Sequence, residues 1–223
     1  MGAPAAARAI VPSIAYETAW QRAGYVLVAG VDEAGRGAWA GPVSAAAVIL
    51  PAWDAIPPAF AGVADSKLLD APTRERLFDV ICAGAVSFGV GMVAAEEIDR
   101  IGILPATRAA MWIALDALRP QPEVILIDAV PLADPAGRPQ AAIIKGDQLC
   151  LSIAAASILA KVSRDRWMRQ ADADYPGYGL AQHKGYGTAQ HAAALRALGP
   201  CALHRRSYAP VAASIAAAEA GHE

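Results

Sequence analysis

Acidic side chains follow two apolar segments of the sequence, at the point where each segment ends. Asp32 and Glu33 come directly after residues 25–31, and Asp128 comes directly after residues 124–127. A carboxylate that leaves the carboxyl end of a strand is badly placed for a core and well placed for a cleft. Each acid alone also fits a helix cap or a solvated loop. The repeated arrangement predicts that the two sites are neighbours in space.

A cluster of carboxylates indicates a hard divalent cation. Mg²⁺ takes oxygen ligands in octahedral geometry, keeps some waters, and balances negative charges that would otherwise repel. Two such ions about 4 Å apart activate a water and stabilise the leaving oxygen in an in-line displacement at phosphorus. The acids therefore favour phosphodiester hydrolysis as the chemistry.

Two glycine-containing segments suit contact with a nucleic acid. Residues 35–37 read Gly-Arg-Gly, and glycines beside an arginine let the backbone approach a ligand closely. Residues 183–188 place Tyr186 between two glycines beside Lys184, which suits stacking on a base or sugar next to a phosphate contact. The alternatives are an ordinary glycine-rich turn and a tight turn with a packed tyrosine.

Other possible sites carry weaker signals. Lys161 and Asp165 are four residues apart in a helical pattern, where a surface ion pair contributes a few tenths of a kcal/mol. The histidines lack cysteine partners or H-E-x-x-H spacing, so they do not form a zinc set; they are His183, His191, His204 and His222.

Length and composition fit one domain that needs no disulfide bonds for stability. A chain of 223 residues buries roughly 70% of its unfolded surface. It has no window near the roughly 18 uninterrupted apolar residues of a membrane span, and residues 1–23 lack the features of a secretory signal. We therefore expect a cytoplasmic protein. Three widely spaced cysteines fit free thiols in a reducing compartment; they are Cys82, Cys150 and Cys201.

Charge is unevenly distributed along the chain. The net charge of −2 gives no global attraction to nucleic acid, but residues 151–210 hold eight Lys or Arg against three Asp. This segment is a candidate phosphate-binding face. The alternative is a solvated surface that happens to be basic.

The apolar patterns predict a mixed sheet covered by helices. Strands are expected at 25–31, 43–50, 85–93, 124–127 and 141–144, and helices at 70–84, 94–100, 105–119, 147–171 and 188–198. Strands come first and then alternate with helices, which indicates an α/β fold.

Taken together, these segments resemble the type 2 ribonuclease H family (ribonuclease HII). The matching motifs are V-D-E-A-G-R-G at 31–37, A-G-P at 40–42, D-S-K at 65–67, I-D at 127–128, K-G-D at 145–147, S-I-A-A-A-S-I-L-A-K-V-S-R-D at 152–165, H-K-G-Y-G-T at 183–188 and H-R-R-S-Y-A-P-V at 204–211. A chance match to so many motifs in order is improbable, so the resemblance is specific.

The resemblance implies an RNase H-like fold, with a mixed central sheet flanked by helices and a C-terminal helical extension. It implies a catalytic domain over residues 25–211, between a loosely structured leader at 1–24 with one short helix and an Ala-rich tail at 212–223. It also implies four catalytic acids that bind Mg²⁺ or Mn²⁺, two ions acting during catalysis; these acids are Asp32, Glu33, Asp128 and Asp165.

The same resemblance implies the substrate. The enzyme would be a monomeric endoribonuclease that hydrolyses the RNA strand of RNA–DNA hybrids. It would also cut 5′ of single ribonucleotides in duplex DNA, leaving a 3′-hydroxyl and a 5′-phosphate, and so act in ribonucleotide excision repair and primer removal during replication. Gly35, Arg36 and Gly37 would contact the 2′-hydroxyl, and Tyr186 would stack near the RNA–DNA junction. The phosphate contacts implied are Lys184, Lys67 and Ser157.

Some residues depart from the family pattern, and two rival functions remain open. Ala38 stands where many members have proline, Ala129 where many have glycine, and Leu68 and Asp70 where lysine and serine are common. One rival is a nuclease or resolvase of the same broad fold that acts on DNA alone. The other is a non-catalytic nucleic-acid-binding protein that uses the basic C-terminal third.

Overall fold

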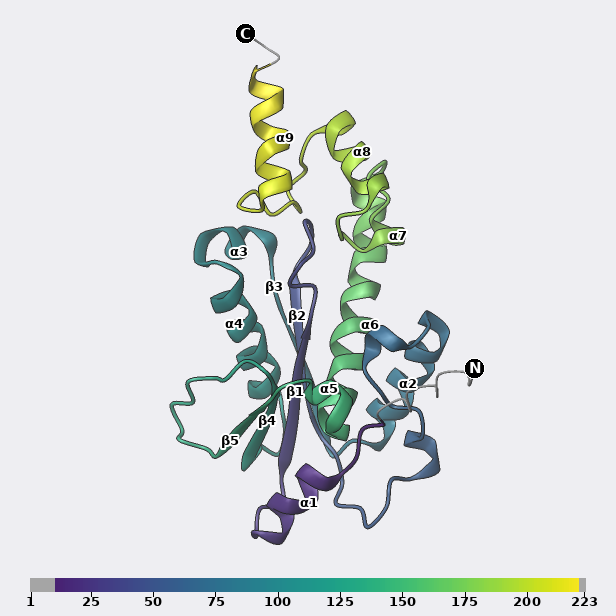
Figure 1. Ribbon diagram of the computed structural model, residues 1–223, viewed down its shortest axis with the longest axis vertical. Helices are drawn as coiled ribbons and strands as arrows, with labels where there is room; N and C mark the ends of the chain where they lie inside the picture. The colour runs from purple at the N-terminus through teal and green to yellow at the C-terminus, as the bar shows by residue number, and fades with distance from the viewer. Residues whose placement is uncertain (1–10, 221–223) are drawn as a thin grey trace, which may run out of the picture.

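The computed structural model describes residues 11–220, which are built around a five-stranded mixed sheet (Figure 1). The strands are β1 Val28–Ala34, β2 Val43–Ile49, β3 Ser87–Val93, β4 Val124–Asp128 and β5 Gln140–Ile143. Their order across the sheet is β3-β2-β1-β4-β5. The pairs β1/β2 and β2/β3 are antiparallel, whereas β1/β4 and β4/β5 are parallel. The predicted mixed sheet is confirmed.

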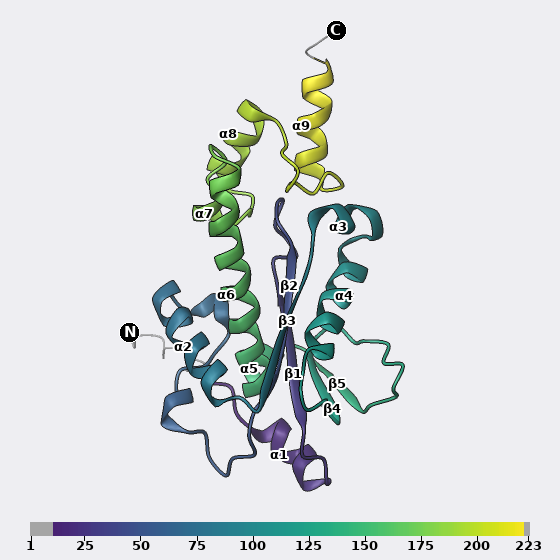
Figure 2. The same cartoon turned by 180° about the vertical axis from the view of Figure 1, so that it is seen from behind.

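Nine α-helices in the described residues surround the sheet. They are α1 Ala15–Arg22, α2 Ala71–Gly84, α3 Ala95–Ile101, α4 Ile103–Asp116, α5 Gly146–Leu149, α6 Leu151–Asp174, α7 Leu180–His183, α8 Ala189–Leu198 and α9 Ala209–Ala220. α4 covers one face of the sheet and α6 covers the other, as the front and rear views both show (Figures 1 and 2). None of these helices is long and apolar enough to cross a membrane.

The first half of α6 packs against the middle of the sheet on one side and against α2 on the other. All residues from 151 to 160 are buried, so this part of the helix is apolar or small all round. At Gly30 of β1 an added Cβ would lie 2.2 Å from the backbone carbon of Ser152. The helix backbone therefore lies directly on β1, beside the strand residues that follow Gly30.

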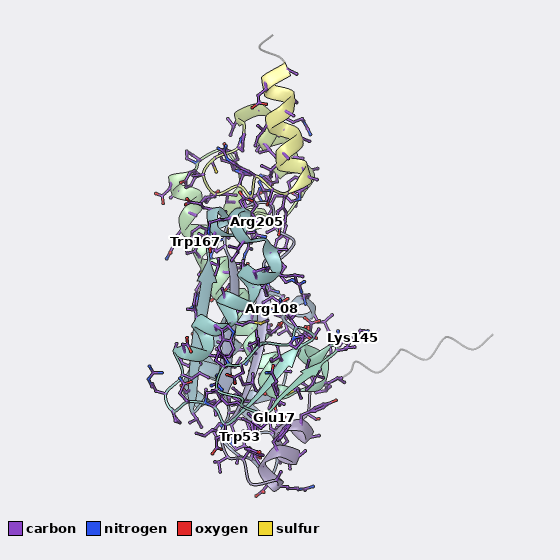
Figure 3. The ribbon with its side chains drawn as sticks, turned by 90° about the vertical axis from the view of Figure 1, so that its left-hand side faces the viewer. Glu17, Trp53, Arg108, Lys145, Trp167 and Arg205 are labelled. Carbon is purple, nitrogen blue, oxygen red and sulfur yellow. The ribbon has the colours of Figure 1, made fainter. Side chains whose placement is uncertain are left out.

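The N-terminal segment is attached to this helix by one buried carboxylate. Oε1 of Glu17 in α1 accepts hydrogen bonds from the backbone N–H of Ser152, at 2.7 Å, and from the thiol of Cys150, at 3.1 Å. The first N–H groups of a helix have no partner within it, so Glu17 caps α6 from outside. Figure 3 shows Glu17 in the lower part of the molecule, whereas Arg205 lies in the upper half, below α9.

Several predicted boundaries are corrected. The helix expected at 147–171 is interrupted, because Cys150 adopts extended φ and ψ angles between α5 and α6. The expected Ala-rich tail begins inside α9, which runs continuously from Ala209 to Ala220. β1 extends beyond the predicted end, so Asp32 and Glu33 lie within the strand rather than after it. Residues 1–10 and 221–223 of the expected leader and tail lie outside the described residues.

The cap on α6 predicts a large stability cost for a change at Glu17. Glu17→Ala leaves the Ser152 N–H buried without an acceptor, which costs about 1–3 kcal/mol. Glu17→Gln keeps an acceptor oxygen and is expected to cost less. Urea unfolding of both variants beside the wild type measures the difference. Equal stability of Glu17→Ala and the wild type would contradict the capping role.

Candidate active site

Three carboxylates meet at the carboxyl ends of β1 and β4. These strands are parallel neighbours, with Val31 opposite Ile127, so the next residues, Asp32 within β1 and Asp128 at the end of β4, lie side by side. Asp147 joins them from α5. Carboxylate oxygens of Asp32, Asp128 and Asp147 all lie within 4.8 Å of one another. The prediction that the two strand ends bring their acids together is confirmed.

Hydrogen bonds fix the position of these acids. The backbone N–H of Gly146 donates to Oδ1 of Asp128 at 2.8 Å, which ties the start of α5 to the end of β4. The N–H of Glu33 donates to Oδ1 of Asp32 at 2.7 Å. The second oxygens of Asp32 and Glu33 are buried without a hydrogen-bond partner. Two orphaned carboxylate oxygens beside two other acids leave a position that a cation would fill.

The raised pKa values of these carboxylates also indicate that the cluster lacks a compensating positive charge. Burial raises the pKa of Asp32 well above its usual range, and the charges of Glu33 and Asp128 raise it further. The pKa of Asp128 is raised chiefly by burial. The pKa of Asp147 is raised by burial and then by the charges of Asp65 and Asp128. A bound divalent cation offsets both the free-energy cost of burying these charges and their mutual repulsion. The donor set therefore fits Mg²⁺ or Mn²⁺.

Asp147 is a site residue that the sequence analysis missed. The signal was present, because Asp147 ends the K-G-D motif at 145–147, but the spacing did not show that α5 turns back toward β4. Asp165, which the resemblance placed in the ligand set, lies on α6 instead, and its Oδ1 accepts from Lys161 Nζ at 2.7 Å. The ion pair suggested by the i, i+4 spacing is therefore present, and the three-acid group contains Asp147 and not Asp165.

A cation at the edge of the cluster partly balances its charge. Nζ of Lys67 lies 3.5 Å from Oδ2 of Asp147 and 3.9 Å from Oδ1 of Asp65. Partial burial lowers the pKa of Lys67, but the carboxylates of Asp65, Asp32 and Asp147 outweigh it and raise the pKa overall. The Lys67 side chain is 71% exposed, so its ammonium group remains accessible to a ligand.

The cluster opens into a cleft with a cavity of about 730 Å³. Asp32, Glu33 and Asp128 lie on its floor, and most of the predicted binding residues line it; these are Gly35, Arg36, Gly37, Lys67 and Tyr186. Arg74 and Lys161 line it as well. Cationic and aromatic groups around a carboxylate floor suit a polyanion that carries bases.

Two predicted phosphate contacts point elsewhere. Ser157 is 2% exposed, and its Oγ lies 2.9 Å from Oγ of Ser66, so it lies beneath the cleft surface. Lys184 has left-handed backbone angles, and its Nζ donates to the carbonyl of Ala181 at the end of α7. Both placements favour a supporting role over a direct phosphate contact.

A fully buried arginine shapes the Gly-Arg-Gly segment. The guanidinium of Arg164 donates to the carbonyls of Pro42, Ala40 and Lys184 at 2.7, 3.0 and 2.9 Å. Gly35 has φ +90°, and a Cβ there would lie 2.1 Å from Nε of Arg164. Burial lowers the pKa of Arg164 to about 10, so the guanidinium stays protonated at neutral pH. Gly35 is therefore required both by backbone conformation and by space.

A second buried arginine holds the other side of the same segment. Arg205 donates to the carbonyl of Gly41 through Nε and Nη2, and to the carbonyl of Arg36 through Nη1 at 2.8 Å. The hydroxyl of Tyr208 also donates to Arg36 O, at 2.5 Å. The Arg36 side chain pairs with Oε1 of Glu33 at 2.9 Å. Residues from the C-terminal part of the chain thus fix the backbone beside the acids.

Tyr186 lines the same cleft as this segment. Its half-buried ring has Nζ of Lys161 and Cζ of Arg164 each 5.3 Å from the centroid. Two cations near one ring lower the cost of placing a phosphate beside it. The structure brings Tyr186, Lys161 and the Gly-Arg-Gly segment into one cleft with the acids.

A mixed sheet flanked by helices, with clustered acids at its strand ends and a cationic cleft, defines an RNase H-like hydrolase. A family model described as ribonuclease HII matches residues 29–211. The chain belongs to the ribonuclease HII family, and it is an endonuclease with ribonuclease H activity on RNA–DNA hybrids. The rival non-catalytic interpretation is therefore excluded.

Relatives and solved structures agree with this assignment. The chain is 52% identical over 203 residues to a ribonuclease HII of Chloroflexus aurantiacus, covering 91% of this chain and 95% of that protein. It is 56% identical over 185 residues to one of Pelobacter propionicus, covering 83% and 82%. The crystal structure of ribonuclease H2 from Pyrococcus horikoshii superposes with a TM-score of 0.69 at 27% identity, covering 84% and 96%.

Alanine substitutions at the two glycines of the Gly-Arg-Gly segment are predicted to differ in their cost to stability. Gly35→Ala is expected to destabilise the protein by at least about 1–2 kcal/mol, because of the positive φ and the clash with Arg164. Gly37→Ala is the matched control, since nothing lies within 4 Å of its added Cβ, and a change within about 0.5 kcal/mol is expected. Thermal unfolding compares the two. A Gly37→Ala variant as unstable as Gly35→Ala would contradict this account.

Proposed function

We propose that this member of the ribonuclease HII family cuts on the 5′ side of single ribonucleotides in duplex DNA, as well as within RNA–DNA hybrids, and leaves a 3′-hydroxyl and a 5′-phosphate. The observation that carries the proposal is one cleft lined by acids of the cluster, by the glycine-flanked backbone of residues 35–37 and by the half-buried ring of Tyr186. The rival specificity for DNA alone offers no use for a backbone segment able to reach a 2′-hydroxyl.

The proposed metal ligands are Asp32, Glu33, Asp128 and Asp147. Their support is the proximity of three of these carboxylates and the orphaned oxygens of Asp32 and Glu33. Bound Mg²⁺ or Mn²⁺, two ions during catalysis, would supply an activated water and neutralise charge at the phosphate. The chain's own residues fix the acids: Gly146 N–H orients Asp128, and Lys67 balances the charge of Asp147.

The proposed recognition of the ribonucleotide uses the backbone of residues 35–37. Peptide groups of Gly35, Arg36 and Gly37 would bind the 2′-hydroxyl, supported by Arg205, which donates to the Arg36 carbonyl, and by Arg164, which lies against Gly35. The Tyr186 ring would stack on the nucleotide at the junction. Lys67 and Lys161 would contact phosphates, with Asp165 orienting Lys161 through their 2.7 Å ion pair.

The wider biological setting also belongs to the proposal. We propose a monomeric cytoplasmic enzyme that removes misincorporated ribonucleotides in repair and RNA primers in replication. Support comes from the three cysteines, which are unpaired in the described chain as in a reducing compartment. We propose that the catalytic domain spans residues 25–211. α1 precedes these limits and α9 extends past them.

Cleavage of a labelled DNA duplex that contains one ribonucleotide tests the proposed specificity. With Mg²⁺ or Mn²⁺ we expect one cut on the 5′ side of the ribonucleotide, with no cut in EDTA and an intact all-DNA duplex. Mapping the product ends on a sequencing gel locates the cut. Cleavage of the all-DNA duplex at a similar rate would favour the DNA nuclease, and cleavage of long hybrids alone would reject the embedded-ribonucleotide activity.

The ligand assignment predicts that Asp147 and Asp165 differ in metal binding. Asp147→Asn and Asp128→Asn are expected to lose about 10²-fold or more in turnover, because a ligand charge is removed with little change in volume. Without metal, the melting temperature of Asp147→Asn should not fall, since a repelling charge is removed. The stabilisation by Mn²⁺ should become smaller.

Asp165→Asn is the matched control for metal binding. Its carboxylate pairs with Lys161 and is not part of the three-acid group, so stabilisation by Mn²⁺ should stay near that of the wild type. Melting curves across a Mn²⁺ titration measure this for each variant. Loss of Mn²⁺ stabilisation in Asp165→Asn, with retention in Asp147→Asn, would restore Asp165 as the ligand and reject Asp147.

A further inference from the structure

Three buried histidines form a continuous chain behind the segment that carries Tyr186. His183 lies in α7, His191 in α8, and His204 in the loop after α8 (Figure 1). The rings of His183 and His191 stack with centroids 4.3 Å apart, and Nε2 of His191 lies 3.1 Å from Nε2 of His204. Their exposed fractions are 9%, 0% and 2%. The proposed reaction uses none of these imidazoles directly.

The partners of His183 define its protonation. Its Nε2 lies 2.8 Å from the carbonyl of Tyr178, and a carbonyl only accepts, so Nε2 carries the proton. Its Nδ1 lies 3.1 Å from the backbone nitrogen of Gly185, which only donates, so Nδ1 is the unprotonated acceptor. His183 therefore holds Gly185, directly before Tyr186, as a neutral ring in one tautomer.

The other two rings are defined in the same way. Nδ1 of His191 lies 3.0 Å from the carbonyl of Tyr186, so this nitrogen donates. Nδ1 of His204 lies 3.0 Å from the backbone nitrogen of Cys201, so this nitrogen accepts. The remaining contact is then consistent with two neutral rings: His204 Nε2–H donates to the lone pair of His191 Nε2. The three histidines have one arrangement of ring protons that satisfies all of these hydrogen bonds.

This arrangement resists both protonation and metal binding. A second proton on His191 or His204 would have to point at an N–H donor at about 3 Å. In agreement, burial and then the neighbouring histidine lower the pKa of His204 to about 4, and burial lowers the pKa of His191. Every imidazole lone pair already accepts a hydrogen bond, so none is free for a metal ion.

We propose that the histidine chain positions Tyr186, with His191 holding its carbonyl and His183 holding the N–H of the preceding residue. These histidines are positioning residues, and they act on selectivity through the Tyr186 ring. The inference rests on the proposed function, because it assigns a role at the ribonucleotide junction. His204 extends these contacts to the backbone of Cys201.

Two substitutions at His191 separate positioning from packing. His191→Asn keeps an amide N–H near the place of Nδ1, and so keeps a donor for the Tyr186 carbonyl. His191→Gln places its polar atoms near Nε2 instead, and so keeps the contact with His204 but loses the Tyr186 contact. Both variants remove the same ring, so loss of packing affects them alike.

The measured quantity is the ratio of kcat/KM on a duplex with one ribonucleotide to kcat/KM on a uniform RNA–DNA hybrid. We expect His191→Gln to lower this ratio by roughly tenfold, the value of one lost hydrogen bond, and His191→Asn to stay near the wild type. In a Tyr186→Ala background, His191→Gln should have no further effect, because both changes act through one ring.

Equal ratios in the two folded His191 variants would overturn the proposal, as would an additive effect in the Tyr186→Ala background. Nitrogen NMR shifts of the wild-type imidazoles give a second test that needs no variant. We expect Nε2–H on His183 and His204 and Nδ1–H on His191. Any other set of tautomers would contradict the proposed hydrogen bonds between the histidines and their partners. Absence of cleavage at the single ribonucleotide by the wild-type enzyme would instead reject the proposed function. The NMR measurement would still test the histidine hydrogen bonds in that case.

Discussion

Repulsion between buried carboxylates is the constraint on which the site depends. Parallel pairing of β1 with β4 places Asp32 and Asp128 side by side, and α5 adds Asp147. Burial and the charges of neighbouring carboxylates raise the pKa of each of the three, so the fold bears an unfavourable arrangement in the absence of a cation. Such a site persists because the surrounding sheet and α6 are packed tightly enough to impose it.

Two buried arginines hold the substrate-reading side of the cleft. Arg164 and Arg205 are fully buried, and the carbonyls that they contact belong to the loop between β1 and β2 and to residue 184. Each arginine comes from a segment distant in sequence, so the loop is fixed only when α6 and the C-terminal part are in place. Catalysis and recognition are therefore both supported through α6, whose N-terminus is capped by Glu17.

Local sequence patterns predicted the strands and helices. They did not predict contacts between segments that are brought together where the chain reverses direction. Apolar runs located all five strands, and Thr188 was found beside the start of α8, which it caps. Asp147 was not among the expected ligands, because a helix predicted to run continuously over 147–171 gave no sign that α5 is separate from α6. The structure places Asp147 beside Asp32 and Asp128. The tautomers of the histidine chain depend on contacts between distant segments, which no spacing reveals.

The central claim is that Asp32, Asp128 and Asp147 hold the catalytic metal. The most direct measurement is anomalous X-ray scattering from crystals of the full chain soaked in Mn²⁺. We predict an anomalous peak about 2.0–2.3 Å from carboxylate oxygens of all three residues. A peak on Asp165 that leaves Asp147 without a metal contact would contradict the account, as would a fully occupied crystal with no peak at the three acids.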